Sequence, residues 1–324
     1  MCVKRKELQD FNSLYSLLDY FSTEKVCEDY LASIRWDGEP KCVYCNSKRI
    51  GLLQGKTKRY KCYGCRKQFG VKVGTIFHNS KIPLRKWFMA IYLVAATKKG
   101  ISSHQLAEDL KIHQESAWFL LQRIRETYTP AKRKLAKRTV EVDETYYGGK
   151  EKNKHKSKKT PNNQGRSTKT RTPVFGVLER NGKVYAVPVK DTTGRTILPI
   201  VESVVSKNSK IYTDEYRPYR SLRNKFRHEY VKHNQGEYAR GDVHTNGIEG
   251  FWSQLKRGIS GTYHSVSKKH LERYVNEATF RYNNRQSNGG EKFNIVLSKS
   301  SVRLDFDTLV NGKTKTEEKG RAKT

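Results

Sequence analysis

Four of the six cysteines stand in two closely spaced pairs near the N-terminus. Cys42 and Cys45 form one C-x2-C pair, Cys62 and Cys65 form the other, and 16 residues separate the pairs. Two such knuckles joined by a short hairpin can place four thiolates around one Zn²⁺ ion. The alternative is a pair of disulfides. Because the N-terminal residues do not resemble a secretory signal, we expect a reducing compartment, which favours zinc.

Three acidic residues further along the chain are candidate ligands for divalent metal ions. Asp143 ends one predicted strand, Asp214 ends another, and Glu249 lies on a predicted helix 35 residues after Asp214. Carboxylates at the ends of adjacent strands, with a third from a flanking helix, can hold two ions about 3.5–4 Å apart for phosphodiester chemistry. Oxygen ligands favour Mg²⁺, or Mn²⁺, over zinc. A solvated acidic surface is the alternative interpretation.

Neighbouring acidic residues compete with two of these candidates. Glu215 follows Asp214, whereas Glu141 and Glu144 lie on either side of Asp143. Because side chains alternate between the two faces of a strand, Glu144 should point away from the face that carries Asp143. Glu141 should share that face, but it lies further from the strand end.

The helix that carries Glu249 also has a polar face with a basic residue. An apolar stripe repeats at helical spacing and comprises Ile248, Phe251, Trp252 and Leu255. Asn246, Glu249 and Lys256 lie on a different face. Lys256, two turns after Glu249, is a candidate contact to a DNA phosphate or terminal base; a solvated Glu–Lys face is the alternative. His244 and Asn246 are secondary candidates that would orient DNA or a metal-bound water, or cap the helix.

These residues fall in a region whose predicted elements follow the order β-β-β-α-β-α-β-α. The expected elements are strands at 139–143, 174–179, 184–189, 211–214 and 228–232, and helices around 197–205, 216–224, 245–257 and 271–282. Arg180–Lys183, which contains Asn-Gly, predicts a hairpin turn. Pro199 fits only the first turn of its helix. This order predicts an α/β fold of the ribonuclease-H-like kind.

Three short amphipathic helices are predicted between the cysteines and this α/β region. The first begins after Pro83, the second is capped by Ser102-Ser103, and the third begins near His113. They predict a helix-turn-helix-like segment in which Arg123 and Arg125 are exposed and bind DNA. A purely structural three-helix connector is the alternative.

The composition and charge of the chain indicate a polyanionic partner. The chain has 65 Lys and Arg residues against 32 Asp and Glu residues, for a net charge of +33. No apolar run reaches the roughly 18 residues that a membrane span needs, so DNA is favoured over a membrane. The predicted organisation is N-terminal helices and zinc ribbon at 1–80, the helix-turn-helix-like segment at 81–130, the ribonuclease-H-like domain at 131–300 with a basic loop at 148–172, and a charged tail at 301–324.

Several motifs together resemble one family. The N-terminal ones are Arg35-Trp36-Asp37-Gly38, the two cysteine pairs and Gly74-Thr75-Ile76-Phe77, and the later ones are Val142-Asp143-Glu144-Thr145-Tyr146-Tyr147-Gly148-Gly149, Thr213-Asp214 and His244-x-Asn246-x2-Glu249-x2-Trp252-x2-Leu255-Lys256-Arg257. In these motifs the chain resembles bacterial insertion-sequence DDE transposases of a zinc-ribbon group related to Merlin elements. The resemblance implies that Asp143, Asp214 and Glu249 form a Mg²⁺-binding catalytic triad, with Lys256 as a basic fourth residue.

The resemblance also implies a function and partners. The expected activity is metal-dependent cleavage and strand transfer of double-stranded DNA, acting on element ends and a target. Lys256 and Arg257 are expected to contact DNA, the chain is expected to act as a homo-dimer or larger oligomer, and a cytoplasmic, nucleoid-associated location in a bacterium is expected. Two alternatives remain: a DNA-binding regulator with an inactive transposase-like domain, and a ribonuclease-H-like nuclease that cuts without joining.

Overall fold

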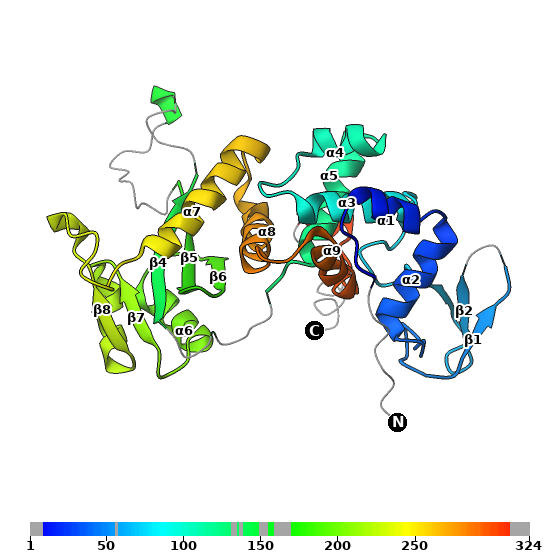
Figure 1. Ribbon diagram of the computed structural model, residues 1–324, viewed down its shortest axis with the longest axis horizontal. Coiled ribbons are helices and arrows are strands. Elements are labelled where there is room, and N and C mark those ends of the chain that lie inside the picture. Colours follow the sequence, from blue (N-terminus) through cyan, green and yellow to red (C-terminus); the bar gives the residue numbers. More distant parts are fainter. Residues whose placement is uncertain are drawn as a thin grey trace, which may run out of the picture. The chain divides into compact units, whose positions relative to one another are not determined.

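The computed structural model describes residues 9–55, 58–130, 135, 139–148, 155–158 and 170–311 (Figure 1). The chain divides into two compact units. The first combines Met1–Tyr128 with Gln286–Thr324, and the second is Thr129–Arg285. Among the described residues, no helix has the length and apolar character needed to cross a bilayer. Most of the basic loop predicted at 148–172 lies outside the described residues.

The first unit is built mainly from helices around an aromatic core. Its helices are α1 (Leu14–Tyr20), α2 (Glu24–Trp36), α3 (Leu84–Ala96), α4 (Ser103–Leu110), α5 (Gln114–Glu126), α9 (Gly289–Ser298) and α10 (Phe306–Asn311). The predicted helices at 84, 103 and 114 are confirmed, and the hydroxyl of Ser102 caps α4 by accepting from the Gln105 amide at 3.1 Å. The hydroxyl of Thr23 caps α2 in the same way.

Helix α9 joins this unit although the sequence prediction placed it with the catalytic domain. The ring of Phe293 on α9 lies 5.5 Å from the ring of Phe88 on α3 and 5.9 Å from that of Phe21. All three side chains are fully buried. The physical reason for the placement is burial of apolar surface, because without α9 the rings of Phe88 and Phe21 would be exposed to water.

A small three-stranded antiparallel sheet adjoins the cysteine pairs in the first unit, and Cys62 is the last residue of its second strand. Its strands are β1 (Ile50–Leu53), β2 (Arg59–Cys62) and β3 (Gln68–Gly70), in the order β1-β2-β3. Tyr60 and Phe69 stack at 5.5 Å, and Trp36 from α2 packs edge-on to Tyr60. The few apolar side chains in this cluster form a core too small to hold the sheet unaided.

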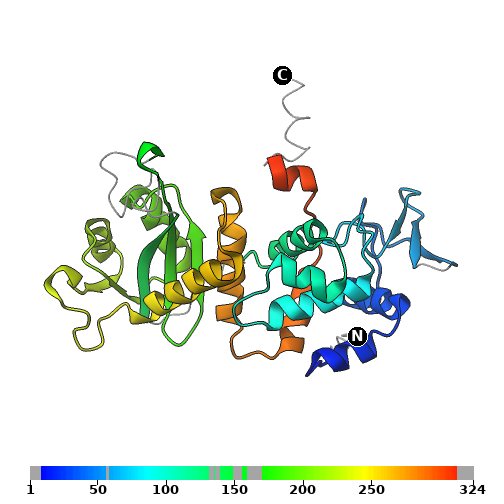
Figure 2. The ribbon, with the colours of Figure 1, turned by 90° about the horizontal axis from the view of Figure 1, so that it is seen from above.

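The second unit is a five-stranded sheet with helices on both faces (Figure 2). The strands β4 (Thr139–Tyr147), β5 (Thr172–Glu179), β6 (Val184–Pro188), β7 (Lys210–Thr213) and β8 (Arg227–Tyr230) lie in the order β6-β5-β4-β7-β8. The first three strands are antiparallel neighbours, and β4, β7 and β8 are parallel. This topology confirms the predicted ribonuclease-H-like fold.

Alternation along the strands separates the two faces of the sheet. Val140 and Val142 pack with α6 (Gly194–Val204) on one face, and Val174 and Leu178 pack with α7 (Asn246–Gly258) and α8 (Leu271–Asn283) on the other. Short 3-10 segments, including Arg217–Asn224 and Lys268–His270, and a π-helical turn, Ile259–Tyr263, complete the connections. Residues 141 and 143 of β4 therefore face α7.

In this unit the predicted hairpin turn is present, whereas Pro199 lies further into its helix than predicted. The hairpin turn is confirmed: the Gly182 amide donates to the Glu179 carbonyl at 2.9 Å, and Asn181 adopts a left-handed φ of 54°. The expectation that Pro199 occupies a first helical turn is wrong, because α6 begins at Gly194. Pro199 is exposed, so water can solvate the carbonyl that loses its helical partner.

Candidate active site and zinc centre

The parallel pairing of strands β4 and β7 brings Asp143 and Asp214 close enough to interact electrostatically. Strands β4 and β7 are aligned with Glu141 beside Tyr212. Continued by two residues, this register places Asp143, in the middle of β4, beside Asp214, which follows the last residue of β7. Asp214 is buried, and Asp143 is partly exposed. Asp214 directly follows β7, as predicted, but the prediction that Asp143 ends its strand is wrong, because pairing with β5 extends β4 to Tyr147.

This pair of carboxylates is electrostatically strained. Burial, and next the neighbouring carboxylates of Glu144 and Asp214, hold the pKa of Asp143 well above its ordinary value. Two acids at one site disfavour ionisation of both, and a divalent cation reverses that penalty. A hard divalent cation such as Mg²⁺ or Mn²⁺ prefers oxygen ligands and would relieve the repulsion between these carboxylates, so the pair suits such an ion.

Helix α7 is tied to this pair through a tryptophan. The indole Nε1 of Trp252 donates a hydrogen bond to Oδ2 of Asp143 at 3.0 Å. The spacing of Trp252 in the apolar stripe predicted a buried side chain but not this hydrogen bond. The stripe itself is confirmed as the buried face of α7. A hydrogen bond of this kind orients a carboxylate for metal binding.

Glycine in the adjacent strand leaves the space for that tryptophan. Gly176 on β5 pairs with Asp143 on β4. A Cβ atom at position 176 would lie 2.6 Å from two ring carbons of Trp252, closer than real contacts allow. The signal available in the sequence was a glycine inside an otherwise β-rich run, which often marks a close approach of another element.

The third predicted ligand, Glu249, is exposed on the first turns of α7. Its Oε1 accepts from the hydroxyl of Thr245 at 2.7 Å. Among the described residues, the four cysteines form the only group of at least three His, Cys, Asp or Glu side chains close enough to share a metal ion. Their ligand atoms all lie within 4.8 Å of one another. The structure thus places Glu249 on the helix that Trp252 ties to Asp143, without joining its carboxylate to Asp143 and Asp214 in one tight cluster.

The competing acidic residues have other partners. Glu144 accepts a hydrogen bond from the hydroxyl of Tyr219, which belongs to the core on the α6 face, so the predicted alternation is confirmed. Glu215 accepts from the backbone amides of His233 and Asn234 at 2.8 and 3.3 Å. Glu141 faces α7 as predicted, but it is buried and ion-paired with Arg180 at 2.8 Å.

The predicted basic residues divide into exposed and buried sets. Lys256 and Arg257 are exposed in the last turn of α7. The expectation that Arg123 and Arg125 are exposed is wrong, because both are buried in α5. The guanidinium of Arg123 donates to the carbonyls of Leu304 and Ile76 at 3.2 and 3.1 Å. Arg123 therefore anchors the segment before α10 in the first unit.

The secondary candidates lie at the start of α7. Thr245, not Asn246, occupies the N-cap position, and Asn246 is the first, exposed residue of the helix. Nδ1 of His244 lies 2.9 Å from Nη2 of Arg180. Because a guanidinium can only donate, this ring nitrogen accepts the hydrogen bond. His244 is thus engaged with Arg180, a residue that the sequence analysis did not single out.

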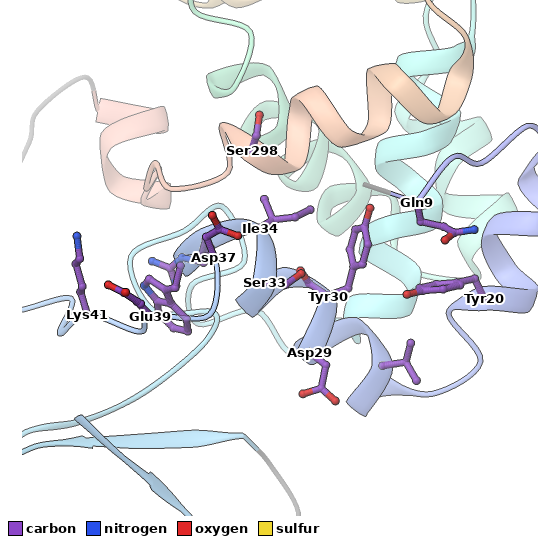
Figure 3. A pocket seen from close by; sticks show the side chains of 13 residues that line it. Gln9, Tyr20, Asp29, Tyr30, Ser33, Ile34, Asp37, Glu39, Lys41 and Ser298 are labelled. Carbon is purple, nitrogen blue, oxygen red and sulfur yellow. The ribbon is translucent and has the colours of Figure 1, made fainter. Parts of the chain in front are cut away.

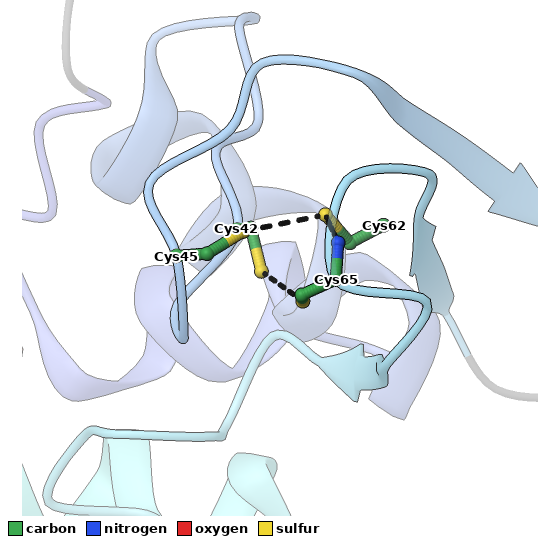
Figure 4. Close-up of side chains that lie close together, drawn as sticks. All are labelled: Cys42, Cys45, Cys62 and Cys65. Carbon is green, nitrogen blue, oxygen red and sulfur yellow. Dashed lines mark hydrogen bonds between the residues drawn. The ribbon is translucent and has the colours of Figure 1, made fainter.

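The four paired cysteines converge on one point (Figure 4). Sγ of Cys42 lies 3.5 Å from Sγ of Cys65, and Sγ of Cys45 lies 3.6 Å from Sγ of Cys62. A tetrahedral zinc site with Zn–S bonds of about 2.3 Å separates its sulfurs by about 3.8 Å. The thiols are free rather than paired in disulfides. The arrangement therefore fits a structural zinc site and disfavours the disulfide alternative.

A cavity of about 830 Å³ lies elsewhere in the first unit (Figure 3). It is lined mainly by α2 and the turn that follows it, including Asp29, Tyr30, Asp37 and Glu39, and by Ser298 of α9. None of the candidate catalytic or zinc-binding residues lines it. The cavity is therefore separate from the chemistry described above.

The raised pKa of Asp143 predicts how pH affects stability. Because the folded-state pKa lies above the unfolded value of about 4, the folded protein binds an extra proton between the two values, and the free energy of unfolding falls as pH rises through that range. We expect Asp143→Asn to have a higher Tm than wild type near pH 7 without Mg²⁺, with a difference that shrinks towards pH 4. Thermal melts of dialysed, zinc-loaded protein across pH measure this.

Added Mg²⁺ should abolish that difference, because a bound cation stabilises the carboxylate of the wild type alone. Asp242→Asn, which replaces an exposed acid, is the control and should show no such pH trend. Equal Tm values for Asp143→Asn and wild type at neutral pH would contradict the interpretation.

Comparison with known proteins places the chain in a family. Residues 134–283 match the ISXO2-like transposase domain, and residues 22–68 match the transposase zinc-ribbon domain. An uncharacterized protein in transposable element ISH50 of Halobacterium salinarum is 29% identical over 289 residues, which cover 86% of this chain and 97% of that protein. An uncharacterized transposase-like protein of Haemophilus influenzae is 35% identical over 103 residues, 32% of this chain and 82% of that protein.

Among solved structures, the Mos1 strand transfer complex matches 63% of this chain and 75% of that chain, at 10% identity and a TM-score of 0.21. The sequence matches, together with the cysteine centre and the sheet topology, define a transposase-type protein with a zinc ribbon. The chain belongs to the DDE transposases that carry an ISXO2-like transposase domain together with a transposase zinc ribbon.

Proposed function

We propose that this transposase cleaves DNA at the ends of its element and joins them to a target with divalent metal ions held by Asp143, Asp214 and Glu249. The observation that carries the proposal is the proximity of Asp143, on β4, to Asp214, directly after β7, with α7 tied to Asp143 through Trp252. Bound Mg²⁺ ions would supply activation of the attacking water or 3′-hydroxyl and stabilisation of the leaving oxygen.

The chain's own residues have distinct tasks in this proposal. Trp252 orients the carboxylate of Asp143, and the hydroxyl of Thr245 holds that of Glu249 near the start of α7. To bind metal together with the aspartates, the Glu249 side chain would have to release the hydroxyl of Thr245. No covalent protein–DNA intermediate is needed, so Tyr146 and Tyr147 remain structural; the hydroxyl of Tyr147 accepts from the Val266 amide at 2.9 Å.

DNA contact is proposed for two regions of the chain. Exposed Lys256 and Arg257 at the end of α7 would neutralise phosphates near the carboxylates. The zinc ribbon and helices α3 to α5 would recognise terminal inverted repeats, and the net charge of +33 supplies non-specific attraction. Because Arg123 and Arg125 are buried, we leave them out of the proposed contact surface. A dimer or larger oligomer, acting on nucleoid DNA in the cytoplasm, would hold two element ends together.

A strand-transfer assay tests this function. Purified protein, a labelled element-end duplex and a supercoiled target would be incubated with and without Mg²⁺. We expect joined products that require Mg²⁺. Nicked but unjoined DNA would favour a ribonuclease-H-like nuclease, and end binding without any cleavage would favour a DNA-binding regulator.

A further inference from the structure

The N-terminus of α7 is anchored from another element rather than by its own cap. The first amides of a helix lack helical partners and normally bond to the side chain at the N-cap. Here the N-cap residue, Thr245, makes no such bond, and its hydroxyl donates instead to Glu249. Instead, Oε2 of Glu141, on β4, accepts from the amide of Ile248 at 2.9 Å.

The carboxylate of Glu141 is fully engaged at this position. It is 1% exposed, and its Oε1 accepts from Nε of Arg180 at 2.8 Å. A buried carboxylate is stable only when it is paired and hydrogen-bonded, and here one cation and the positive end of a helix satisfy it. Glu141 is therefore not available as a metal ligand, although it shares a face of β4 with Asp143.

Arg180 connects this carboxylate to the segment leading into α7. Its Nη2 donates to the carbonyl of His244 at 3.0 Å and lies 2.9 Å from the ring Nδ1 of the same residue. Its own backbone amide donates to the carbonyl of Thr139 at the start of β4. The planar guanidinium can donate to Glu141 through Nε and to His244 through Nη2 at the same time, which a lysine ammonium cannot do with this geometry.

The sequence of α7 is adapted to this close approach. Gly247 lies in the first turn of the helix, where a Cβ would come within 2.8 Å of Oε2 of Glu141 and 3.2 Å of Leu178. A larger residue at position 247 would therefore push the helix away from the carboxylate. Together with Gly176 beneath Trp252, Gly247 lets α7 lie directly on the sheet.

We propose that Glu141 and Arg180 form a clamp, the α7 clamp, that fixes the start of α7 and thereby sets the positions of Glu249 and Trp252 relative to Asp143. Glu141 and Arg180 are positioning residues that act through α7. The consequence for catalysis rests on the proposed function, whereas the clamp itself is a property of the fold.

Hydrogen exchange measured by mass spectrometry tests the clamp without any DNA. We expect Glu141→Gln to speed amide exchange in the first turns of α7 by about 10-fold to 100-fold, because a hydrogen bond to a charged group is lost there. Strands β5 and β6 should exchange as in wild type. The matched control is Glu277→Gln on α8, since Glu277 is also 1% exposed and paired with an arginine, Arg281. It should leave α7 unchanged.

End cleavage supplies the second measurement. Glu141→Gln should lower kcat and raise the Mg²⁺ concentration needed for half-maximal rate, with unchanged affinity for end DNA. Arg180→Lys keeps the charge but should lose nearly as much activity, because an ammonium cannot replace the guanidinium contacts. The double variant Glu141→Gln/Arg180→Met leaves no unpaired charge behind and should show the same loss as Glu141→Gln. Wild-type exchange rates at α7 in folded Glu141→Gln would overturn the clamp. If wild type cleaves no DNA, the proposed function fails, while the exchange result still decides the clamp.

Discussion

Asp143→Asn is expected to lower the rate of element-end cleavage by about 1,000-fold or more, while the affinity for end DNA stays close to wild type. Metal ions at a phosphoryl centre contribute several kcal/mol of transition-state stabilisation, and about 1.4 kcal/mol corresponds to tenfold in rate. Asparagine keeps the shape and can still accept from Trp252, so the fold should be retained. Single-turnover cleavage of a labelled end and a mobility-shift titration measure the two quantities.

Further substitutions decide which acidic residues share this role. We expect Asp214→Asn and Glu249→Gln to cause losses of the same order, because each removes a proposed metal ligand. Glu215→Gln is the matched control: it replaces the acid next to Asp214, whose carboxylate accepts from two backbone amides. Cleavage at the wild-type rate by any of the three variants would remove that residue from the site, and a large loss in Glu215→Gln would place the metal elsewhere.

The second large effect concerns the zinc ribbon. Cys42→Ser should release zinc and unfold the ribbon, because structural zinc sites contribute about 10–16 kcal/mol of apparent binding energy in small domains. The cluster that Cys42 shares with Tyr60, Cys62 and Phe69 is too small to replace that energy. Without metal, the thiols share their protons unequally: the amide of Cys65, as the largest cause, lowers the pKa of Cys62 to about 6. Against a hydrogen bond from the Ser47 amide, burial and the other three thiols raise the pKa of Cys45 to about 12.

Zinc content and DNA binding together test this. Metal analysis should find one zinc per wild-type chain and little in Cys42→Ser, and specific end binding should weaken by about tenfold or more as the ribbon contacts are lost. Cys27→Ala, which removes a buried cysteine outside the cluster, should retain zinc. Full zinc content in Cys42→Ser would refute the four-cysteine site. Unchanged end affinity after zinc loss would show that the ribbon does not recognise the ends.

Local patterns in the chain were sufficient for much of the architecture. The cysteine spacing predicted the cluster of four thiols, and helical periodicity predicted α3, α4, α5 and the buried stripe of α7. Alternation along β4 correctly separated Glu144 from Asp143. Such features depend on neighbours a few residues away, and a repeat of two or of 3.6 residues records which side of an element is buried.

Contacts between distant segments were decided by the tertiary structure alone. Arg123 and Arg125 look like exposed basic residues at the end of an amphipathic helix, but residues near 76 and 304 cover Arg123. Trp252 looks like one more apolar residue, yet its indole nitrogen reaches Asp143 because Gly176 leaves room for the ring.

The same distinction applies to the candidate site as a whole. The sequence by itself determined that a zinc ribbon precedes a ribonuclease-H-like domain, and that Asp214 follows one of its strands. It wrongly ended the strand that carries Asp143 at that residue, because pairing with β5 extends β4 to Tyr147. Only the fold decided that Glu141 anchors α7 through Ile248 and Arg180, because those partners lie 107 and 39 residues away along the chain. Hydrogen bonds at that separation leave no periodic trace in the sequence, since they depend on how strands and helix pack.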